Sequence, residues 1–264
     1  MDLQLQDKTA LVTGSTAGIG FAIAELLAAE GARVIINGRT EARVNAAIKS
    51  IQGAHSKARL KPFAADLSQK AGVEKLIKKF SSVDILVNNL GIYQVKEFAE
   101  INDEEWLHMF DVNVMSGVHL SRHYLPKMLK NNWGRIVFIS SESGLQIPSE
   151  MIHYGMTKTA QLAIARGLAE LTSGTNVTVN SILPGPTRSE GVENFIDSIA
   201  KEKNVDAAAI EKDFFTNLRP SSLLQRFATS QEVANMVAFI CSPLSAGTNG
   251  ASLRVEGGII RAIG

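Results

Sequence analysis

The stretch Thr9-Ala-Leu-Val-Thr-Gly-Ser-Thr-Ala-Gly-Ile-Gly20 decides the fold of this chain. Its apolar first part, Thr9–Thr13, predicts a β-strand, and the pattern from Gly18 onward predicts a helix. In the turn between them, Gly14 permits a tight bend, Gly18 allows close approach of the backbone to a ligand, and Gly20 lets helix and strand pack together. The free N–H groups and positive dipole end of such a helix suit a pyrophosphate. The alternative is a turn that needs positive φ angles for structural reasons alone.

The same alternation continues along the rest of the chain. Short apolar runs predict further strands at 33–37, 60–65, 83–88, 134–140, 176–182 and 252–256. Helical patterns lie between them, at 41–51, 71–80 and 103–129 and around Tyr154. Apolar strands separated by helices indicate a parallel sheet covered on both faces. We therefore expect a doubly wound α/β fold of three layers, the Rossmann fold, in a single domain that spans residues 1–264.

The alternation lapses between residues 187 and 224. This charged segment follows a strand end, where open α/β sheets bind ligands, so we expect an insertion of short helices that forms a lid over a substrate. Its apolar residues, Phe195, Ile196, Phe214 and Phe215, suggest an apolar substrate part, and its cations, Arg188, Lys201 and Arg219, suit an anionic group. A surface excursion or a subunit contact is the alternative. After it, Thr229-Ser-Gln-Glu232 resembles a capping box that opens another helix.

Composition narrows the class of protein. The 264 residues are 45% hydrophobic and 20% charged, which is typical of a soluble globular protein. A net charge of +1 gives no argument for nucleic acid or a membrane surface. The single cysteine, Cys241, excludes an internal disulfide and fits a reducing compartment. The polar N-terminus does not resemble a signal peptide and no apolar run is long enough to span a membrane, so we expect a cytoplasmic protein.

Three residues suggest a site for proton transfer. Tyr154 and Lys158 are four residues apart, and Ser141 lies thirteen residues before Tyr154. On a helix, residues i and i+4 share a face, so the Lys158 ammonium is expected beside the Tyr154 phenol. A neighbouring cation favours the phenolate and lowers a pKa that is ordinarily about 10. A serine hydroxyl from another segment then orients a carbonyl or alcohol oxygen against that phenol. Alone, the spacing also occurs by chance on many helices.

The end of the second predicted strand, Ile36-Asn-Gly-Arg-Thr40, bears on the choice between nicotinamide dinucleotides. A carboxylate at this place binds a ribose 2′-hydroxyl, whereas a cation accommodates a 2′-phosphate. The segment holds no carboxylate, Gly38 leaves room, and Arg39 offers a bidentate phosphate partner. This favours NADP over NAD, the alternative being that Arg39 is a solvated loop cation.

With these motifs together, the chain resembles the short-chain dehydrogenase/reductase family in its compact single-domain form, from about Lys8 to Gly258. The resemblance rests on the Thr-Gly-x-x-x-Gly-Ile-Gly loop and on ordered motifs after it. These motifs are Asp66 after strand three, Asn88-Asn-Leu-Gly91, Asn113, Ser141, Tyr154 with Lys158, Pro184-Gly185, and Val255-Glu-Gly-Gly258. Leu90 stands where the family usually has alanine.

The resemblance implies roles for these residues. Tyr154 is expected to be the general acid/base, Ser141 to hold the substrate oxygen, and Lys158 to bind the nicotinamide ribose. Asn113 is expected to support a water chain to Lys158 through its backbone. Asp66 would reach the adenine, and Asn88 the adenosine side. The full set expected to bind the cofactor is Gly14, Ser15, Thr16, Gly18, Ile19, Gly20, Arg39, Asp66, Leu67, Asn88, Gly91, Tyr154, Lys158, Pro184, Gly185, Thr187 and Ser189.

The function that follows is an NAD(P)-dependent dehydrogenase/reductase that acts on CH–OH groups, with NADP(H) favoured. The family resemblance indicates a 3-oxoacyl-thioester or general ketone reductase, with a sugar, polyol or gluconate-type dehydrogenase as alternative. A cofactor-sensing protein on the same fold is the hypothesis from another class. A dehydratase or epimerase is disfavoured by the short chain. The resemblance also implies a homotetramer, with a dimer as the alternative, and with faces supplied by 103–129 and 154–171.

The remaining polar candidates carry weaker predictions. Strand alternation points Ser140 away from Ser141. His153 is expected to point away from the site, in a lining or surface position. His119 and His123 have the i, i+4 spacing of metal ligands, but no third ligand is evident, so an interface or surface role is favoured.

Overall fold

The computed structural model describes every residue except 1, 190–191, 194–195, 197–199, 202–204 and 264. Seven strands form one parallel sheet in the order β3-β2-β1-β4-β5-β6-β9. Their bounds are β1 Thr9–Val12, β2 Arg33–Gly38, β3 Arg59–Ala64, β4 Ile85–Asn88, β5 Gly134–Ile139, β6 Val177–Pro184 and β9 Ser252–Val255. The predicted doubly wound α/β fold is confirmed. The order reverses between β1 and β4, and folds of this kind bind their ligands at the carboxyl ends of the strands at such a point.

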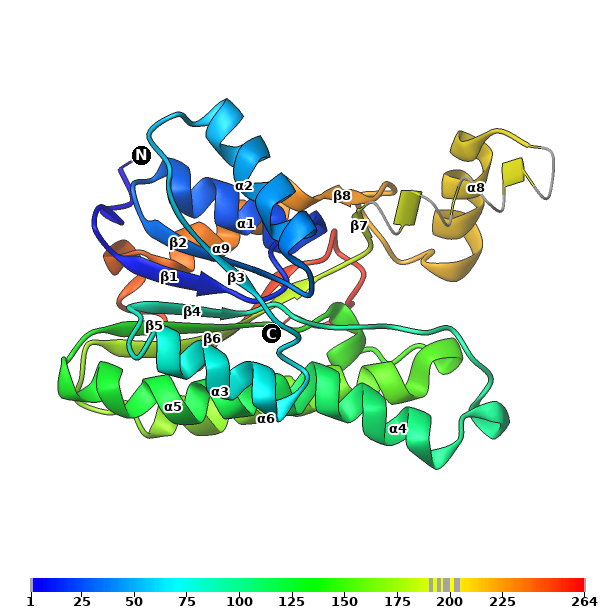
Figure 1. Cartoon of the computed structure of the whole chain (residues 1–264). Coiled ribbons are helices and arrows are strands. Elements are labelled where there is room, and N and C mark those ends of the chain that lie inside the picture. The colour runs from blue at the N-terminus through cyan, green and yellow to red at the C-terminus, as the bar shows by residue number, and fades with distance from the viewer. Residues whose placement is uncertain (1, 190–191, 194–195, 197–199, 202–204, 264) are drawn as a thin grey trace.

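Helices cover both faces of the sheet (Figure 1). On one face lie α1 Gly18–Ala29, α2 Glu41–Ala54 and α9 Ser230–Cys241, and on the other α3 Lys70–Lys79, α4 Asp103–Phe110, α5 Ser116–Lys130 and α6 Ile152–Glu170. One apolar core lies between the sheet and α1, α2 and α9, and another lies between the sheet and α3, α5 and α6. Successive strand residues point to opposite faces, so Val12 and Ile36 belong to the former core and Leu11 and Ile35 to the latter. Both faces of the strands are therefore apolar, as the sequence pattern predicted.

Local signals in the sequence account for several helix ends. The predicted capping box at α9 is confirmed, because the Glu232 N–H donates to Thr229 Oγ1 (3.1 Å) and the Thr229 N–H donates to Glu232 Oε2 (2.7 Å). Asn102 and Glu105 form a second capping box, at α4, that the sequence interpretation overlooked. The long helical stretch expected over 103–129 is interrupted by a π-helical turn, Asp111–Met115, which separates α4 from α5.

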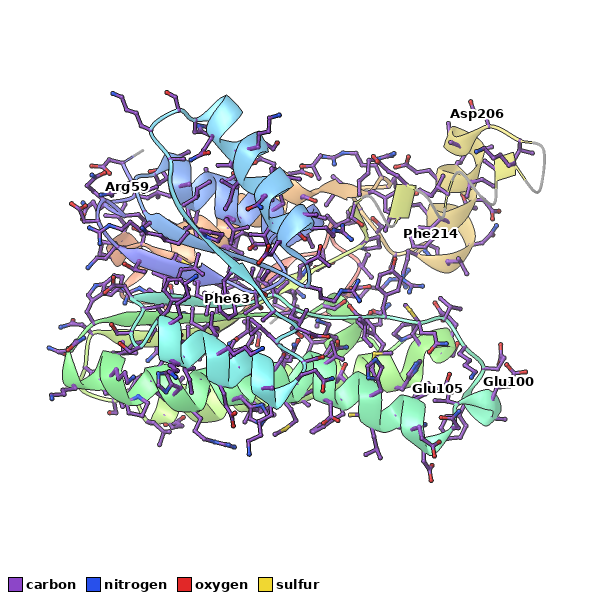
Figure 2. The ribbon with its side chains drawn as sticks, in the orientation of Figure 1. Arg59, Phe63, Glu100, Glu105, Asp206 and Phe214 are labelled. Atoms are coloured by element: carbon purple, nitrogen blue, oxygen red, sulfur yellow. The ribbon has the colours of Figure 1, made fainter. Side chains whose placement is uncertain are left out.

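The segment after β6 leaves the sheet and extends to one side of the molecule (Figure 1). Its described part contains β7 Thr187–Arg188, which pairs with β8 Ala228–Thr229, and α8 Ala207–Asp213, followed by a π-helical turn, Phe214–Leu218. Figure 2 labels Asp206 and Phe214 in this projecting part.

The aromatic residues of this segment pack on each other. Phe215 and Phe227 lie with ring centroids 5.2 Å apart, and Phe214 stacks on Phe227 at 5.1 Å. Ile196 joins the same cluster, so these side chains form a small core of the segment, whereas an apolar contact with substrate was expected. Phe195 lies outside the described residues, and the lid stays a prediction.

None of the helices in the described part of the chain combines the length and apolar character that a membrane crossing requires.

Candidate active site

The loop between β1 and α1 has the backbone shape of a phosphate-binding turn. Gly14 and Gly18 adopt left-handed backbone conformations, with φ of +61° and +56°, which residues other than glycine rarely adopt. Helix α1 begins after Ala17, and no described side chain caps its N-terminus or places a carboxylate in its first turn. The first N–H groups of α1 are thus left for an exogenous anion, which fits the pyrophosphate of a dinucleotide.

Asn37, at the end of β2, fixes this loop from one side. Its Oδ1 accepts a hydrogen bond from the Gly14 N–H (3.1 Å), and its own backbone N–H donates to Ser15 Oγ (2.9 Å). Its amide nitrogen donates to the carbonyls of Phe63 and Ala65, at 3.3 Å and 3.1 Å. Asn37 therefore joins three strand ends, a role that the sequence analysis missed. The only signal was an amide side chain at the end of an apolar strand.

Asn89, after β4, fixes the loop from the other side. Its amide donates to the Thr13 carbonyl (2.8 Å) and to the Gly14 carbonyl (3.2 Å). A Cβ on Gly20 would lie 2.4 Å from both the Asn89 amide nitrogen and the Gly14 carbonyl oxygen. The sequence assigned Gly20 to packing of helix on strand, but the contacts show that it makes room for Asn89 and for the loop itself.

Arg39 occupies the position expected for a 2′-phosphate partner. Its side chain is exposed directly after β2, and within the described ranges it has no hydrogen bond or ion pair. Gly38 lies against Thr16, because a Cβ there would be 2.5 Å from Thr16 Cγ2. The loop and the end of β2 therefore meet beside an unpaired guanidinium.

The other residues expected on the adenosine side, Asp66, Leu67 and Asn88, contact other parts of the protein. The Asp66 carboxylate accepts hydrogen bonds from the Ser68 N–H (2.9 Å) and hydroxyl (2.7 Å). The Leu67 side chain is buried in the core. The Asn88 amide is also buried and donates to Ser121 Oγ of α5 (3.3 Å), so it faces a helix. Cofactor contacts of these three residues stay predictions.

The segment after β6 returns to the phosphate loop. Gly185 continues from Pro184 at the strand end and donates its N–H to the Val255 carbonyl (3.1 Å). Thr187 Oγ1 donates to the Gly185 carbonyl (2.8 Å). A Cβ on Gly18 would lie 3.4 Å from Ser189 Cβ, so Ser189 is brought against the loop.

Ser141, Tyr154 and Lys158 gather at the carboxyl ends of β4 and β5. Ser141 is the second residue after β5, and the other two lie on one face of α6, with Lys158 Nζ 5.5 Å from the Tyr154 ring centroid. Lys158 Nζ donates to the Ile139 carbonyl (2.9 Å). A Cβ on Gly91 would be 3.5 Å from Lys158 Nζ, so the loop after β4 closes on the same group.

Asn113 lies within the π-helical turn, and such turns frequently occur at functional sites. Its side chain accepts from the Ile92 N–H (2.7 Å) and donates to Thr157 Oγ1 of α6 (3.0 Å). Its carbonyl accepts from Gln161 Nε2 (2.6 Å), and Gln161 Oε1 accepts from Lys158 Nζ (3.2 Å). The Gln161 amide thus links the Asn113 carbonyl to Lys158 directly. The water chain expected from Asn113 to Lys158 stays a prediction. Gln161, three residues after Lys158 on the same helix face, was overlooked.

Burial dominates the electrostatics of the pair on α6. It raises the pKa of Tyr154, Glu142 raises it further, and a hydrogen bond with Ser141 lowers it. The expectation that Lys158 would hold this pKa down is not met in this geometry. Burial also lowers the pKa of Lys158 to about 8, which the neighbouring Glu142 opposes.

Glu142 is a second residue that the sequence interpretation missed. Its carboxyl group is buried next to Ser141, and Arg219 approaches it from the projecting segment, with Nε 3.9 Å from Oε1. Arg219 also pairs with Glu150 (3.1 Å), and Arg188 pairs with Glu211 (2.5 Å). Both arginines expected to meet an anionic substrate group are thus already paired with carboxylates.

The flanking polar residues have structural partners. Ser140 Oγ donates to the Lys158 carbonyl (2.8 Å). His153 is fully buried, with its ring 5.8 Å from that of Trp106, and this differs from the expected lining or surface position. A ring nitrogen of His123 lies 3.1 Å from the Ser81 carbonyl oxygen. Over the described residues, no group of three or more His, Cys, Asp or Glu side chains is arranged to hold a metal ion.

Comparison with known proteins identifies the family of the chain. Residues 8–199 match the short chain dehydrogenase family. YvaG, an uncharacterised oxidoreductase of Bacillus subtilis, is 49% identical over 263 residues, covering 100% of both chains. The 3-oxoacyl-[acyl-carrier-protein] reductase of Aquifex aeolicus is 33% identical over 265 residues, covering 98% of this chain and 100% of its own. L-Sorbose reductase from Gluconobacter frateurii, solved in complex with NADPH and L-sorbose, has a TM-score of 0.92 at 29% identity over 100% of both chains. The chain therefore belongs to the short-chain dehydrogenase family, as its motifs indicated.

Proposed function

We propose that this protein is an NADP(H)-dependent oxidoreductase that interconverts a carbonyl and a secondary alcohol. The observation that carries the proposal is the meeting of Ser141, Tyr154 and Lys158 beside the phosphate loop. When bound, the nicotinamide supplies or accepts the hydride. Tyr154 then gives its proton to the substrate oxygen or takes it back, while Ser141 hydrogen-bonds that oxygen. Lys158 would hold the nicotinamide ribose.

Replacement of Tyr154 tests this proposal. Tyr154→Phe is expected to bind NADPH normally and to lose about 100-fold or more in kcat, because the ring remains and the proton donor is gone. Tyr124→Phe is the matched control, since it removes a buried hydroxyl that hydrogen-bonds to Phe80 (2.8 Å) outside the site. Near-normal turnover of the Tyr154 variant in steady-state kinetics would refute the assigned role.

The preference for NADP(H) is proposed from Arg39. Removal of its charge in Arg39→Ala is expected to raise the KM for NADPH by about 10- to 100-fold, the value of one charge-assisted contact, and to leave the KM for NADH unchanged. Lys49→Ala, an exposed cation on α2, is the control. Equal effects on both cofactors, or a wild-type preference for NADH, would contradict the proposal.

For the substrate, we propose a 3-oxoacyl thioester or a general ketone, with a sugar, polyol or gluconate-type substrate as alternative. The similarity to the Aquifex aeolicus reductase supports the first, and that to L-sorbose reductase supports the second. A panel of ketones, 3-oxoacyl thioesters, ketoses and sugar acids, assayed with NADPH, separates them by kcat/KM. Binding of NADPH without turnover of any of them would indicate a cofactor-sensing protein.

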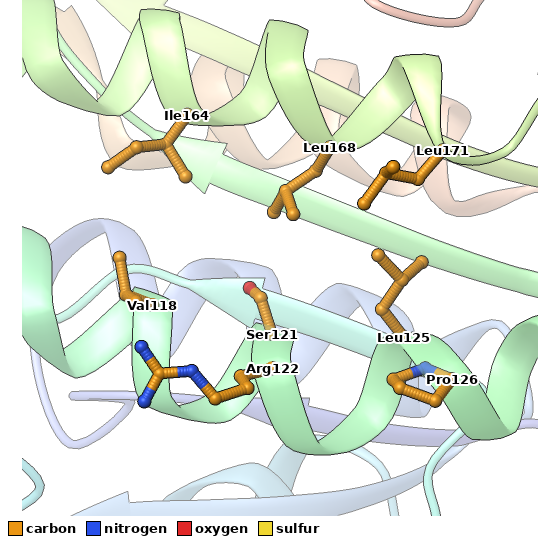
Figure 3. A pocket seen from close by; sticks show the side chains of 8 residues that line it. All are labelled: Val118, Ser121, Arg122, Leu125, Pro126, Ile164, Leu168 and Leu171. Atoms are coloured by element: carbon orange, nitrogen blue, oxygen red, sulfur yellow. The ribbon is translucent and has the colours of Figure 1, made fainter.

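We also propose a homotetramer. The side chains of Ile164 and Leu168 on α6, and of Leu171 just beyond its end, face those of Val118 and Leu125 on α5 across a groove of about 300 Å³ (Figure 3). The groove is apolar and Leu171 is 63% exposed, which favours cover by another subunit.

The buried free thiol of Cys241 fits a cytoplasmic location.

A further inference from the structure

Glu142 is placed where none of the roles above requires a carboxyl group. It follows Ser141 in the 3₁₀ turn Glu142–Gly144 after β5 and is 5% exposed. Its Oε2 lies 2.5 Å from Ser141 Oγ, and its Oε1 lies 3.3 Å from Ser143 Oγ. An acidic group is thus in direct contact with the hydroxyl that has to bind the substrate oxygen.

The hydrogen bonds that Ser141 can make decide which protonation state of Glu142 lets Ser141 bind a substrate oxygen. A hydroxyl group has one proton to donate and two lone pairs that accept. One lone pair of Ser141 Oγ already accepts the Ser143 N–H (3.1 Å). If Glu142 is a carboxylate, it takes the only proton of Ser141, and none is left for a substrate carbonyl. If Glu142 is a carboxylic acid, it fills the second lone pair. The Ser141 proton is then free for the Tyr154 oxygen, with which Ser141 also hydrogen-bonds, or for the substrate oxygen.

Arg219 and Lys158 lie near Glu142, and Arg219 also pairs with a second carboxylate, that of Glu150. Arg219 is 3.9 Å away, but its terminal nitrogens both donate to Glu150 Oε1, at 3.1 Å. On the other side, α6 presents Tyr154 and the ammonium of Lys158. Burial is the largest influence on Glu142 and raises its pKa, while the hydrogen bond with Ser141 and the charge of Arg219 act in the opposite direction.

The neutral form also suits the proton transfer at Tyr154. In the reducing direction Tyr154 loses its proton, and an anion at Glu142 opposes the phenolate by like-charge repulsion. A carboxylic acid at this position does not, and it leaves Lys158 as the charge nearest to the phenolate.

We propose that Glu142 is a positioning residue: as a carboxylic acid it donates its proton to Ser141 Oγ, and thereby directs the Ser141 hydroxyl to donate to the carbonyl oxygen of the substrate. Glu142 keeps its proton through the reaction, and the proton delivered to the substrate comes from Tyr154. The inference rests on the proposed function, because it requires Ser141 to bind the substrate oxygen.

Two substitutions separate the donor from the acceptor role. Glu142→Gln keeps a donor N–H for Ser141 Oγ, so its kcat is expected within about threefold of the wild type. Glu142→Met has a similar length and no donor, so its kcat is expected to fall about 10- to 100-fold with an unchanged KM for NADPH. The kcat of the wild type should decline at the high pH at which Glu142 ionises, and the glutamine variant should lack that decline.

An infrared difference spectrum reads the proton directly and does not depend on the methionine variant being folded. Wild type minus Glu142→Gln at neutral pH is expected to show the carbonyl stretch of a protonated carboxylic acid. The same difference for Glu170→Gln, an exposed residue at the end of α6, should show only a carboxylate. Absence of the acid band, or a Glu142→Gln enzyme as slow as Glu142→Met, overturns the inference.

The Ser141→Ala and Tyr154→Phe variants distinguish this outcome from failure of the proposed function. Full activity in both would remove the proposed function and this inference with it. Loss of activity in both, together with normal kinetics in every Glu142 variant, would overturn only the inference.

Discussion

Lys158 shows how a single functional residue acts on stability. Its side chain is 4% exposed, and burial lowers its pKa from the ordinary 10.5 to about 8. Below pH 8 the native and the unfolded chain both carry the proton, so the unfavourable burial of the charge is fully present. Between about pH 8 and pH 10.5 the unfolded chain binds more protons than the native one, and the free energy of unfolding therefore rises with pH.

Lys158→Met removes this titration. The difference in pKa corresponds to about 3 kcal/mol, so the free energy of unfolding of the wild type should gain up to that amount relative to the variant between neutral pH and about pH 10. Urea unfolding at several pH values measures it. Lys130→Met, at the exposed end of α5, should give a curve parallel to that of the wild type. Parallel curves for the wild type and Lys158→Met would show that Lys158 is not buried as a cation.

Among the elements, the turn between β1 and α1 is held by its neighbours more tightly than its glycine pattern alone reveals. Asn37 from the end of β2 and Asn89 from the loop after β4 both hydrogen-bond the backbone of the turn. Gly20 is the point of closest approach, since both the Gly14 carbonyl and Asn89 lie where its side chain would begin. The turn thus keeps its shape through contacts between three elements.

A methyl group at Gly20 tests this arrangement. Gly20→Ala is expected to lower the free energy of unfolding by about 1–3 kcal/mol, because the loop has to move, and to weaken NADPH binding measured by calorimetry. Gly53→Ala is the matched control, because a Cβ at this position on α2 has nothing within 4 Å. There the better helix propensity of alanine should stabilise by up to about 1 kcal/mol. Equal effects of the two substitutions would contradict the role of Gly20.

These elements also show how far the sequence reaches. Strands and helices follow from the spacing of apolar residues, and Tyr154 with Lys158 follows from helical periodicity, so both were predictable. The contacts of Asn37 with Gly14 and of Gln161 with Asn113 were not, because each joins segments that are distant in the sequence. Glu142 adjoins Ser141 in the chain, but its burial depends on the fold and was not predictable. No local sequence signal predicted the π-helical turn that contains Asn113.

On the scale of the whole molecule, the active site and the exposed apolar surface lie on different parts of α6. Tyr154 and Lys158 are in its first two turns, whereas Ile164, Leu168 and Leu171 line the groove with α5 further along and just beyond its end (Figure 3). A partner subunit seated in the groove would pack against the same helix that positions the catalytic pair. Assembly is therefore expected to stabilise α6 by mass action.

Leu171→Glu tests the homotetramer. The side chain is 63% exposed, so the substitution should leave the fold of the subunit intact while it places a charge in the proposed contact. Sedimentation velocity is expected to show a tetramer for the wild type and smaller species for the variant, with a lower Tm. Leu244→Glu, at a position that is 45% exposed and outside the groove, is the control and should stay tetrameric. A monomeric wild type would sink the proposal. A tetramer that tolerates a charge at Leu171 would instead place the contact on another face.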